Sequence, residues 1–152
     1  LVGEMRDFET INAAVTAAET GHLVFSTLHT TGAAETIDRI IDVYPPHSQG
    51  QIRSQLANSV VGIISQTLVP TADGKGRCAA LEILAATDAI RSMIREGKIF
   101  QIPTAIATGK KNGMFTLDQD LARLVNMGKI TNEVALTKCQ DPNEYRRYLS
   151  VV

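Results

Sequence analysis

The chain has 152 residues, of which 44% are hydrophobic and 20% charged, and its formal net charge is -1 at pH 7. These values are typical of a globular domain; they exclude a disordered chain and give no electrostatic support for nucleic-acid binding. No apolar run approaches the ~20 residues needed to span a bilayer, and the two distant cysteines, Cys78 and Cys139, predict free thiols in a reducing compartment rather than a zinc site.

The first elements predict an alternation of strand and helix. Residues 1–4 read as the end of a strand, and Asp7 as the N-cap of a helix that Gly21 ends. Residues 22–28 predict a short strand, and its continuous apolar run suggests cover on both faces, as in a parallel sheet. Because the sequence opens on the last residues of a strand, we expect it to be the C-terminal part of a longer protein.

Two further helices are expected before the middle of the chain. One begins near Gly32, buries an isoleucine-rich face and stops at Pro45 and Pro46. A long helix is predicted over residues 48–66, with Ile52 and Leu56 on its apolar side.

Two strands and a set of helices complete the prediction. The strands cover residues 68–70 and 77–84, and Asp73-Gly74 between them indicates a hairpin. The expected helices are capped by Thr87 or Asp88, by a Thr116–Gln119 capping box and by Thr131, and one more contains Pro103 in its first turn. Pro142 is taken to begin a polar tail. The whole pattern predicts an α/β core followed by helices.

Acidic and basic residues follow the first predicted strand. Glu4, Arg6 and Asp7 lie at its C-terminal end, the edge at which open α/β sheets bind ligands. Glu4 could hold a magnesium ion or its bound water beside a nucleotide phosphate. The structural alternative is a surface group that caps a helix.

Histidines flank the second predicted strand. His22 precedes it, and His29 follows it beside the hydroxyls of Thr27 and Thr30. A histidine at a strand end can polarise a phosphate or position water, although each could equally be structural. Strict alternation would put the two histidines on opposite faces, which argues against a shared metal site.

A third cluster lies on a predicted helix, over residues 89–96. Arg91 and Arg95 are four residues apart and share a face, beside Ile90 and Ile94. Without context this is an amphipathic helix with a solvated basic side. No GxxxxGK[ST] phosphate loop occurs in the sequence, so we expect the chain alone to be inactive as an ATPase.

Taken together, these motifs resemble those of the type II and type IV secretion ATPases. Residues 1–10 (LVGEMRDFET) resemble the Walker B end of that family, and residues 20–34 (TGHLVFSTLHTTGAA) resemble its His box. Residues 36–39 (TIDR) and 66–68 (QTL) also fit in order and spacing. Residues 89–96 (AIRSMIRE) resemble the signature of the PilT-like retraction ATPases of type IV pili, with Ser92 and Met93 where Asn and Leu are usual. We call residues 89–96 the retraction motif.

The resemblance implies a fold and a division of the chain. It predicts the C-terminal part of a RecA-like P-loop ATPase domain over residues 1–86 and a helical subdomain over residues 87–152. It also implies ATP and Mg²⁺ as cofactors, a homo-hexameric motor for pilus retraction and twitching motility, and inner-membrane pilus machinery as partner. The expected location is cytoplasmic and peripheral at the inner membrane, with neither zinc nor nucleic acid bound.

The resemblance also implies site residues. Glu4 corresponds to the Walker B acid, which binds magnesium through water, and His29 to the His-box residue near the γ-phosphate. His22, Arg6, Thr27 and Thr30 are expected to contribute to nucleotide binding. The retraction motif implies Ala89, Ile90, Arg91, Ile94, Arg95 and Glu96 as residues needed for retraction rather than hydrolysis. The alternatives are a pilus-extension or type II secretion ATPase, or a non-catalytic oligomerisation or docking module.

Overall fold

The computed structural model describes residues 1–150, which form two compact units interleaved along the chain. Unit 1 contains residues 1–63 and 85–105, and unit 2 contains residues 64–84 and the chain from Ile106 onward. This division follows contacts within the chain. The expected boundary between residues 86 and 87 concerns the parent ATPase domain and stays a prediction.

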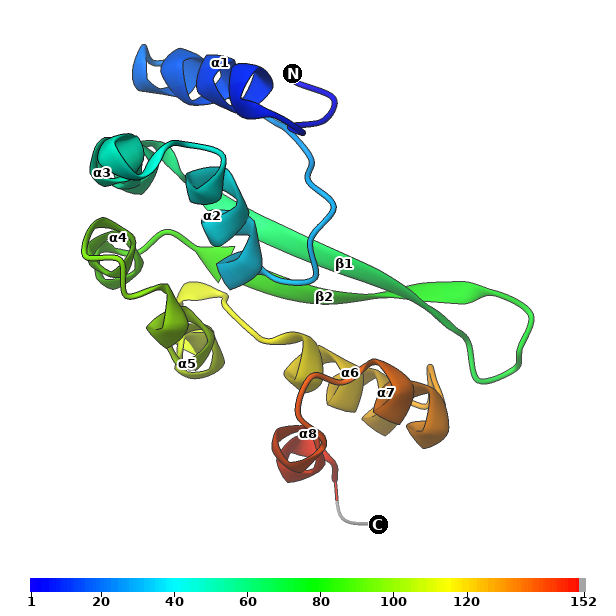
Figure 1. Ribbon diagram of the computed structural model, residues 1–152. Coiled ribbons are helices and arrows are strands. Elements are labelled where there is room, and N and C mark those ends of the chain that lie inside the picture. The colour runs from blue at the N-terminus through cyan, green and yellow to red at the C-terminus, as the bar shows by residue number, and fades with distance from the viewer. Residues whose placement is uncertain (151–152) are drawn as a thin grey trace. The chain divides into compact units, whose positions relative to one another are not determined.

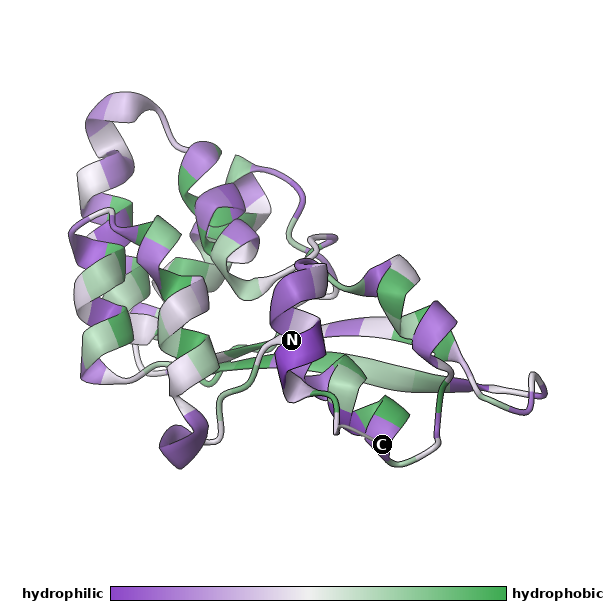
Figure 2. Ribbon diagram, turned by 90° about the horizontal axis from the view of Figure 1, so that it is seen from below, coloured by the Kyte–Doolittle hydropathy of each residue, from purple (hydrophilic) through white to green (hydrophobic). Residues whose placement is uncertain are grey.

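Unit 1 is mainly helical, and α3 is the helix at its centre. Its elements are α1 (Phe8–Glu19), α2 (Ala33–Asp42), the short 3-10 turn η1 (Pro46–Ser48), α3 (Gln49–Ser59), α4 (Asp88–Arg95) and the turn η2 (Ile99–Gln101) (Figure 1). Helix α3 contacts α1, α2 and α4. The helices carry both hydrophobic and hydrophilic residues (Figure 2), and the buried core of unit 1 includes Ile11, Ile37, Ile52 and Ile90.

Asp7 caps the start of α1, as predicted, and the cap is completed by Thr10 as a capping box. The Asp7 carboxylate accepts a hydrogen bond from the backbone N–H of Thr10 at 2.9 Å, and the Thr10 hydroxyl reaches back to the cap. Beyond its other end, Gly21 has a φ of +93°, a conformation that glycine adopts without strain. The cap places residues 3–6 at a defined distance from α1.

The segment over residues 22–28 differs from the expected strand. A single parallel bridge joins Val2 to Ser26, and the Val2 N–H donates to the Phe25 carbonyl. The apolar residues were expected to be covered, yet Leu23 is 73% exposed and Phe25 63% exposed. The reason is that only residues 1–5 pair with this segment in the described part of the chain, and nothing there covers the two side chains.

Helix α3 is shorter than predicted. The chain leaves the helix at Ser59 and forms β1 (Gly62–Pro70), which pairs with β2 (Arg77–Ala85) in a two-stranded antiparallel hairpin. The prediction of a helix to residue 66 was wrong because Val60, Val61, Ile63 and Ile64 are β-branched and Gly62 interrupts them. The predicted turn is confirmed: Thr71 N–H donates to the Gly76 carbonyl, and Gly74 has a φ of +69°.

Unit 2 packs helices onto the hairpin. Its elements beyond β1 and β2 are the 3-10 turn η3 (Lys110–Asn112), α6 (Leu117–Asn126), α7 (Asn132–Lys138) and α8 (Pro142–Tyr148); α5 (Ile102–Thr108) carries the chain in from unit 1. Val69 and Ala80 of the hairpin share a core with Leu121 of α6 and Tyr145 of α8. The predicted caps at Thr87, Thr116 and Thr131 are confirmed.

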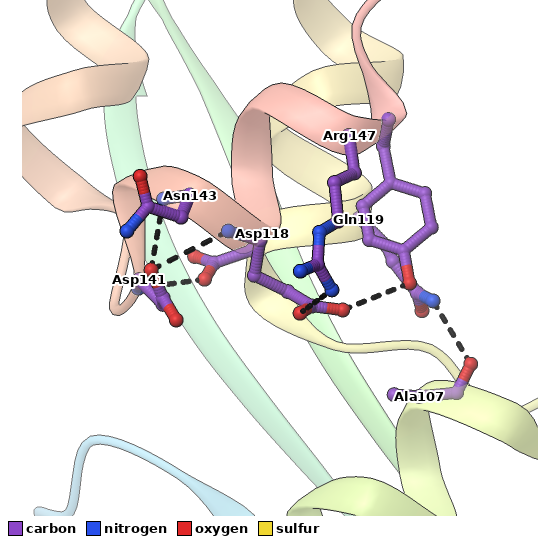
Figure 3. Close-up of polar contacts among 8 residues, drawn as sticks. Ala107, Asp118, Gln119, Asp141, Asn143 and Arg147 are labelled. Atoms are coloured by element: carbon purple, nitrogen blue, oxygen red, sulfur yellow. Dashed lines mark hydrogen bonds and ion pairs between the residues drawn. The ribbon is translucent and has the colours of Figure 1, made fainter.

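The expected polar tail is instead helix α8. Asp141 caps it and Pro142 occupies its first position, a favourable place for proline, and Tyr145 is fully buried. The buried Asp118 carboxylate accepts hydrogen bonds from the backbone N–H groups of Gln140 and Asp141, each at 2.8 Å. Figure 3 shows Asp118 beside Asp141. These two bonds fasten the start of α8 to α6.

Candidate functional site

Glu4 and His29 lie next to each other in unit 1. His29 Nε2 is 3.3 Å from Glu4 Oε1, and the His29 side chain is 84% exposed while that of Glu4 is 25% exposed. Each residue follows one of the two segments joined by the parallel bridge between Val2 and Ser26. Parallel pairing therefore brings the carboxylate and the imidazole to the same end of the paired segments, as the sequence predicted.

Arg6 gives the carboxylate a second positive neighbour. Its Nη2 donates to Glu4 Oε2 at 2.5 Å. This hydrogen bond lowers the pKa of the Glu4 carboxyl below its ordinary value; burial opposes the shift, and the electrostatic effects of Arg6 and His29 add smaller lowering contributions. Glu4 is thus held as a carboxylate, the form able to bind a cation or accept a proton.

Thr27 holds the two segments in register. Its hydroxyl donates to the Gly3 carbonyl at 2.6 Å, and the Met5 N–H donates to the Thr27 carbonyl at 2.9 Å. These bonds lie on both sides of Glu4 along the chain. In this structure Thr27 therefore positions the backbone of Glu4.

Thr30 connects His29 to α2. Its hydroxyl lies 2.7 Å from that of the buried Thr36, which also donates to the Gly32 carbonyl at 2.7 Å. Because Thr36 uses its proton on Gly32, Thr30 is the donor to Thr36. Next to it, Thr31 donates to the Glu35 carboxylate through its N–H and its hydroxyl. The loop that carries His29 is therefore anchored on the first turn of α2.

His22 lies at the other end of its segment. Its Nδ1 is 3.2 Å from the Thr20 hydroxyl and 3.2 Å from the Ala17 carbonyl, at the end of α1. These contacts place His22 against α1, whereas His29 is the histidine beside Glu4.

The retraction motif forms α4 and its C-cap. Ile90 and Ile94 are fully buried, whereas Arg91 and Arg95 bind the end of α3. The Glu96 carboxylate pairs with Lys98 at 2.6 Å and accepts from the Ser92 hydroxyl. The two arginines are therefore more than the solvated basic side of an amphipathic helix.

The single carboxylate of Glu4 suits a metal ion that takes most of its ligands from water and from a bound phosphate. Within residues 1–150 no group of three His, Cys, Asp or Glu side chains could hold a metal ion by itself. Mg²⁺ commonly uses one or two carboxylates and takes its remaining ligands from waters and substrate phosphates. A single ionised, partly exposed carboxylate fits that role.

Two residues of this region were not anticipated from the sequence. Thr36 anchors the His29 loop, and its signal was present: it is a polar residue on the face that Ala33, Ile37 and Ile40 bury. Asn58, which binds Arg95, carried no such signal because it is an exposed polar residue of α3.

Known proteins resemble this chain over most of its length. Residues 1–134 match the family model described as type II/IV secretion system protein. A twitching motility protein of Neisseria gonorrhoeae is 55% identical over 93% of this chain and 38% of its own length. The type IV pilus retraction ATPase PilT of Pseudomonas aeruginosa is 54% identical over 95% of this chain and 42% of its own length.

A solved structure gives the same fold. The crystal structure of the pilus retraction motor PilT with bound ADP matches with a TM-score of 0.86 and 46% identity, over 96% of this chain and 40% of that one. The chain thus spans about two fifths of the length of these relatives. Among residues 1–150, no helix has the length and apolarity that crossing a membrane would require.

Proposed function

Because the chain belongs to the type II/IV secretion system protein family, we propose that its full-length parent is an ATP-hydrolysing motor that drives retraction of type IV pili. Its mixed helices and strands match part of the RecA-like ATPase domain, as expected from the sequence. The proposal extends to the chain what its relatives are named for, twitching motility and pilus retraction.

The adjacency of Glu4 and His29 is the observation that supports this proposal most. A carboxylate and an imidazole 3.3 Å apart, both accessible and both at the end of parallel-paired segments, can face one phosphate group. Phosphoryl transfer requires positioned phosphates, a metal ion, an oriented water and compensated charge. We assign Glu4 to the metal and the water, and His29 to the γ-phosphate.

The chain's own residues have distinct roles in this proposal. Glu4 binds Mg²⁺ through water, and the metal supplies positive charge to the phosphates when it is bound. Arg6 keeps Glu4 ionised, Thr27 fixes its backbone, and Thr30 fixes the His29 loop. His22 supports the same segment from its other end.

Retraction is favoured over pilus extension and type II secretion. The relatives at 54% and 55% identity over almost the whole chain are the PilT retraction ATPase and a twitching motility protein. The pilus assembly ATPase PilB of Pseudomonas aeruginosa matches over only 45% of the chain, at 48% identity. The chain has two cysteines, too few for the four-cysteine zinc insertion expected of extension and secretion ATPases.

The wider assembly is part of the same proposal. The parent forms a homo-hexamer at the cytoplasmic face of the inner membrane and acts on the pilus machinery there. Residues 1–86 belong to its ATPase core and residues 87–152 to a helical subdomain, whose retraction motif serves retraction rather than hydrolysis. The isolated chain, which contains no phosphate loop, has no ATPase activity of its own.

Complementation tests the proposal directly. The parent gene is expressed in strains that lack either the retraction or the extension motor, and the purified parent is assayed for Mg²⁺-dependent ATP hydrolysis. We expect restored twitching only in the retraction-deficient strain, together with hydrolysis in vitro. Rescue of pilus extension would instead assign the parent to pilus assembly.

A further inference from the structure

Both arginines of the retraction motif, on helix α4, form hydrogen bonds with the C-terminal end of α3. Arg91 Nη1 donates to the carbonyl oxygens of Ala57, at 2.5 Å, and Asn58, at 3.1 Å. Arg95 Nη1 donates to the side-chain Oδ1 of Asn58 at 3.2 Å. The last carbonyls of a helix lack partners within the helix and carry partial negative charge, so cations are favourable there. The Arg91 guanidinium thus caps the neighbouring helix α3, and Arg95 binds the side chain of Asn58 beside it.

A backbone hydrogen bond also joins the segments that flank α3 and α4. The Ala86 N–H donates to the Val61 carbonyl at 3.0 Å, immediately before Thr87 caps α4. Val61 follows α3 by two residues, and its own neighbour Val60 closes α3 by donating to the Leu56 carbonyl. A backbone hydrogen bond therefore joins the segment after α3 to the segment before α4. The two arginines of α4 bind the end of α3 itself.

Helix α3 also contacts the helix that leads away from Glu4. It packs against α1, and Gln55 Nε2 donates to Glu19 Oε2 at 2.7 Å. Helix α1 in turn begins at Asp7, next to Arg6 of the candidate site. Within unit 1, α3 thus contacts both the helix that starts at the site and the helix that carries the retraction motif.

We propose that Asn58 is a positioning residue of the motor, which orients Arg95 and locks the retraction motif onto α3. This inference rests on the proposed function, since it needs a motor whose hydrolysis is converted into retraction. Asn58 supplies the side-chain acceptor for Arg95 in this contact between α3 and α4. Arg91 instead binds backbone carbonyls, which no substitution removes. Replacing Asn58 therefore weakens the contact between α4 and α3 without altering either arginine.

Variants of the full-length parent separate this role from hydrolysis. Asn58→Ala should lose pilus retraction in cells while the purified protein keeps ATP hydrolysis close to wild type, as we expect for Arg95→Ala. Asn58→Asp keeps an acceptor oxygen, adds a charge opposite Arg95 and should restore retraction. Ser54→Ala is the matched control, because Ser54 is exposed on the same helix and its hydroxyl donates only to the Gly50 carbonyl.

A double-mutant cycle completes the experiment. Because Asn58→Ala and Arg95→Ala break one contact, their combination should lower Tm no further than the larger single change and cause no additional loss of retraction. Normal retraction by Asn58→Ala where Arg95→Ala retracts nothing, or fully additive shifts in Tm, would overturn the assignment of Asn58. A wild-type parent that does not hydrolyse ATP would refute the proposed function alone, since the Tm cycle still measures the contact.

Discussion

The imidazole Nε2 of His29 lies 3.3 Å from Oε1 of Glu4, although an entire helix separates the two residues in sequence. The parallel bridge between Val2 and Ser26 produces this approach, and the hydroxyls of Thr27 and Thr30 hold it from either side. The pair is therefore built by backbone pairing and by short side-chain anchors. Each of these supports can be removed separately.

Removing Arg6 should change the pH dependence of the motor. The Arg6 hydrogen bond lowers the pKa of Glu4, so in Arg6→Ala that pKa rises toward its ordinary value. Glu4 must be ionised to act, and its charged form would then be lost at a higher pH as the solution is acidified. We expect the acid limb of the kcat profile to move upward in pH. An unchanged limb would contradict this role, and Lys75→Ala, an exposed cation on the hairpin loop, serves as the control.

Thr36→Val should impair turnover without unfolding the protein. Valine fills the same volume but cannot accept the Thr30 hydrogen bond, so the His29 loop loses its anchor on α2. Because Thr30 is only partly buried, water can accept the bond from its hydroxyl, and no fully buried donor is left without a partner. We expect a lower kcat with a nearly unchanged Tm, and recovery in Thr36→Ser. Equal kcat for the valine and serine variants would rule out the anchor.

The cap at Asp7 should contribute stability only when it is ionised. Hydrogen bonds from Thr10 lower the pKa of Asp7, so its contribution is present above the ordinary aspartate pKa and is lost as the pH falls through the lowered value. Asp7→Ala should lower Tm at neutral pH, because the backbone N–H of Thr10 loses its acceptor. Thermal unfolding of the parent should show this difference in Tm shrinking as the pH is lowered below the ordinary aspartate pKa. A difference that persists undiminished in acid would contradict the charged cap.

Asp118 should decide whether α8 stays attached to unit 2. Asp118→Ala leaves the N–H groups of Gln140 and Asp141 without the acceptor that binds them now, at a cost of about 1 to 3 kcal/mol. We expect faster limited proteolysis around residues 140–148. Asn at this position retains one acceptor oxygen and should give an intermediate rate. Protection equal to wild type in the alanine variant would show that Tyr145 alone holds the helix.

Local signals in the sequence predicted most helix starts and the hairpin. Asp7, Thr116 and Thr131 are caps because their side chains accept from the backbone N–H groups of the first turn, a requirement that does not depend on tertiary structure. The end of α3 could not be found in the same way. Ile63 and Ile64 continue a helical apolar spacing, and this spacing conceals the preference of β-branched residues for a strand, here the one that pairs with β2.

The site was predictable only in part, for a related reason. Motif order placed Glu4 and His29 at the ends of two strands, and parallel pairing then brings them together. The supports from Thr36 and Asn58 depend on which side chain of another element lies opposite, which spacing within one helix does not encode. The exposure of Leu23 and Phe25 was unpredictable for the same reason, because burial of a side chain depends on neighbours beyond its own segment.

Hydrolysis by a Glu4→Ala variant of the full-length parent tests the central claim most directly. If Glu4 binds the metal and orients water beside His29, the variant should still bind ATP, while its kcat falls by about a hundredfold or more. Nucleotide titration and a phosphate-release assay on the same preparation give both quantities. Near-normal hydrolysis by this variant would contradict the assignment of Glu4 and His29 to a common nucleotide site.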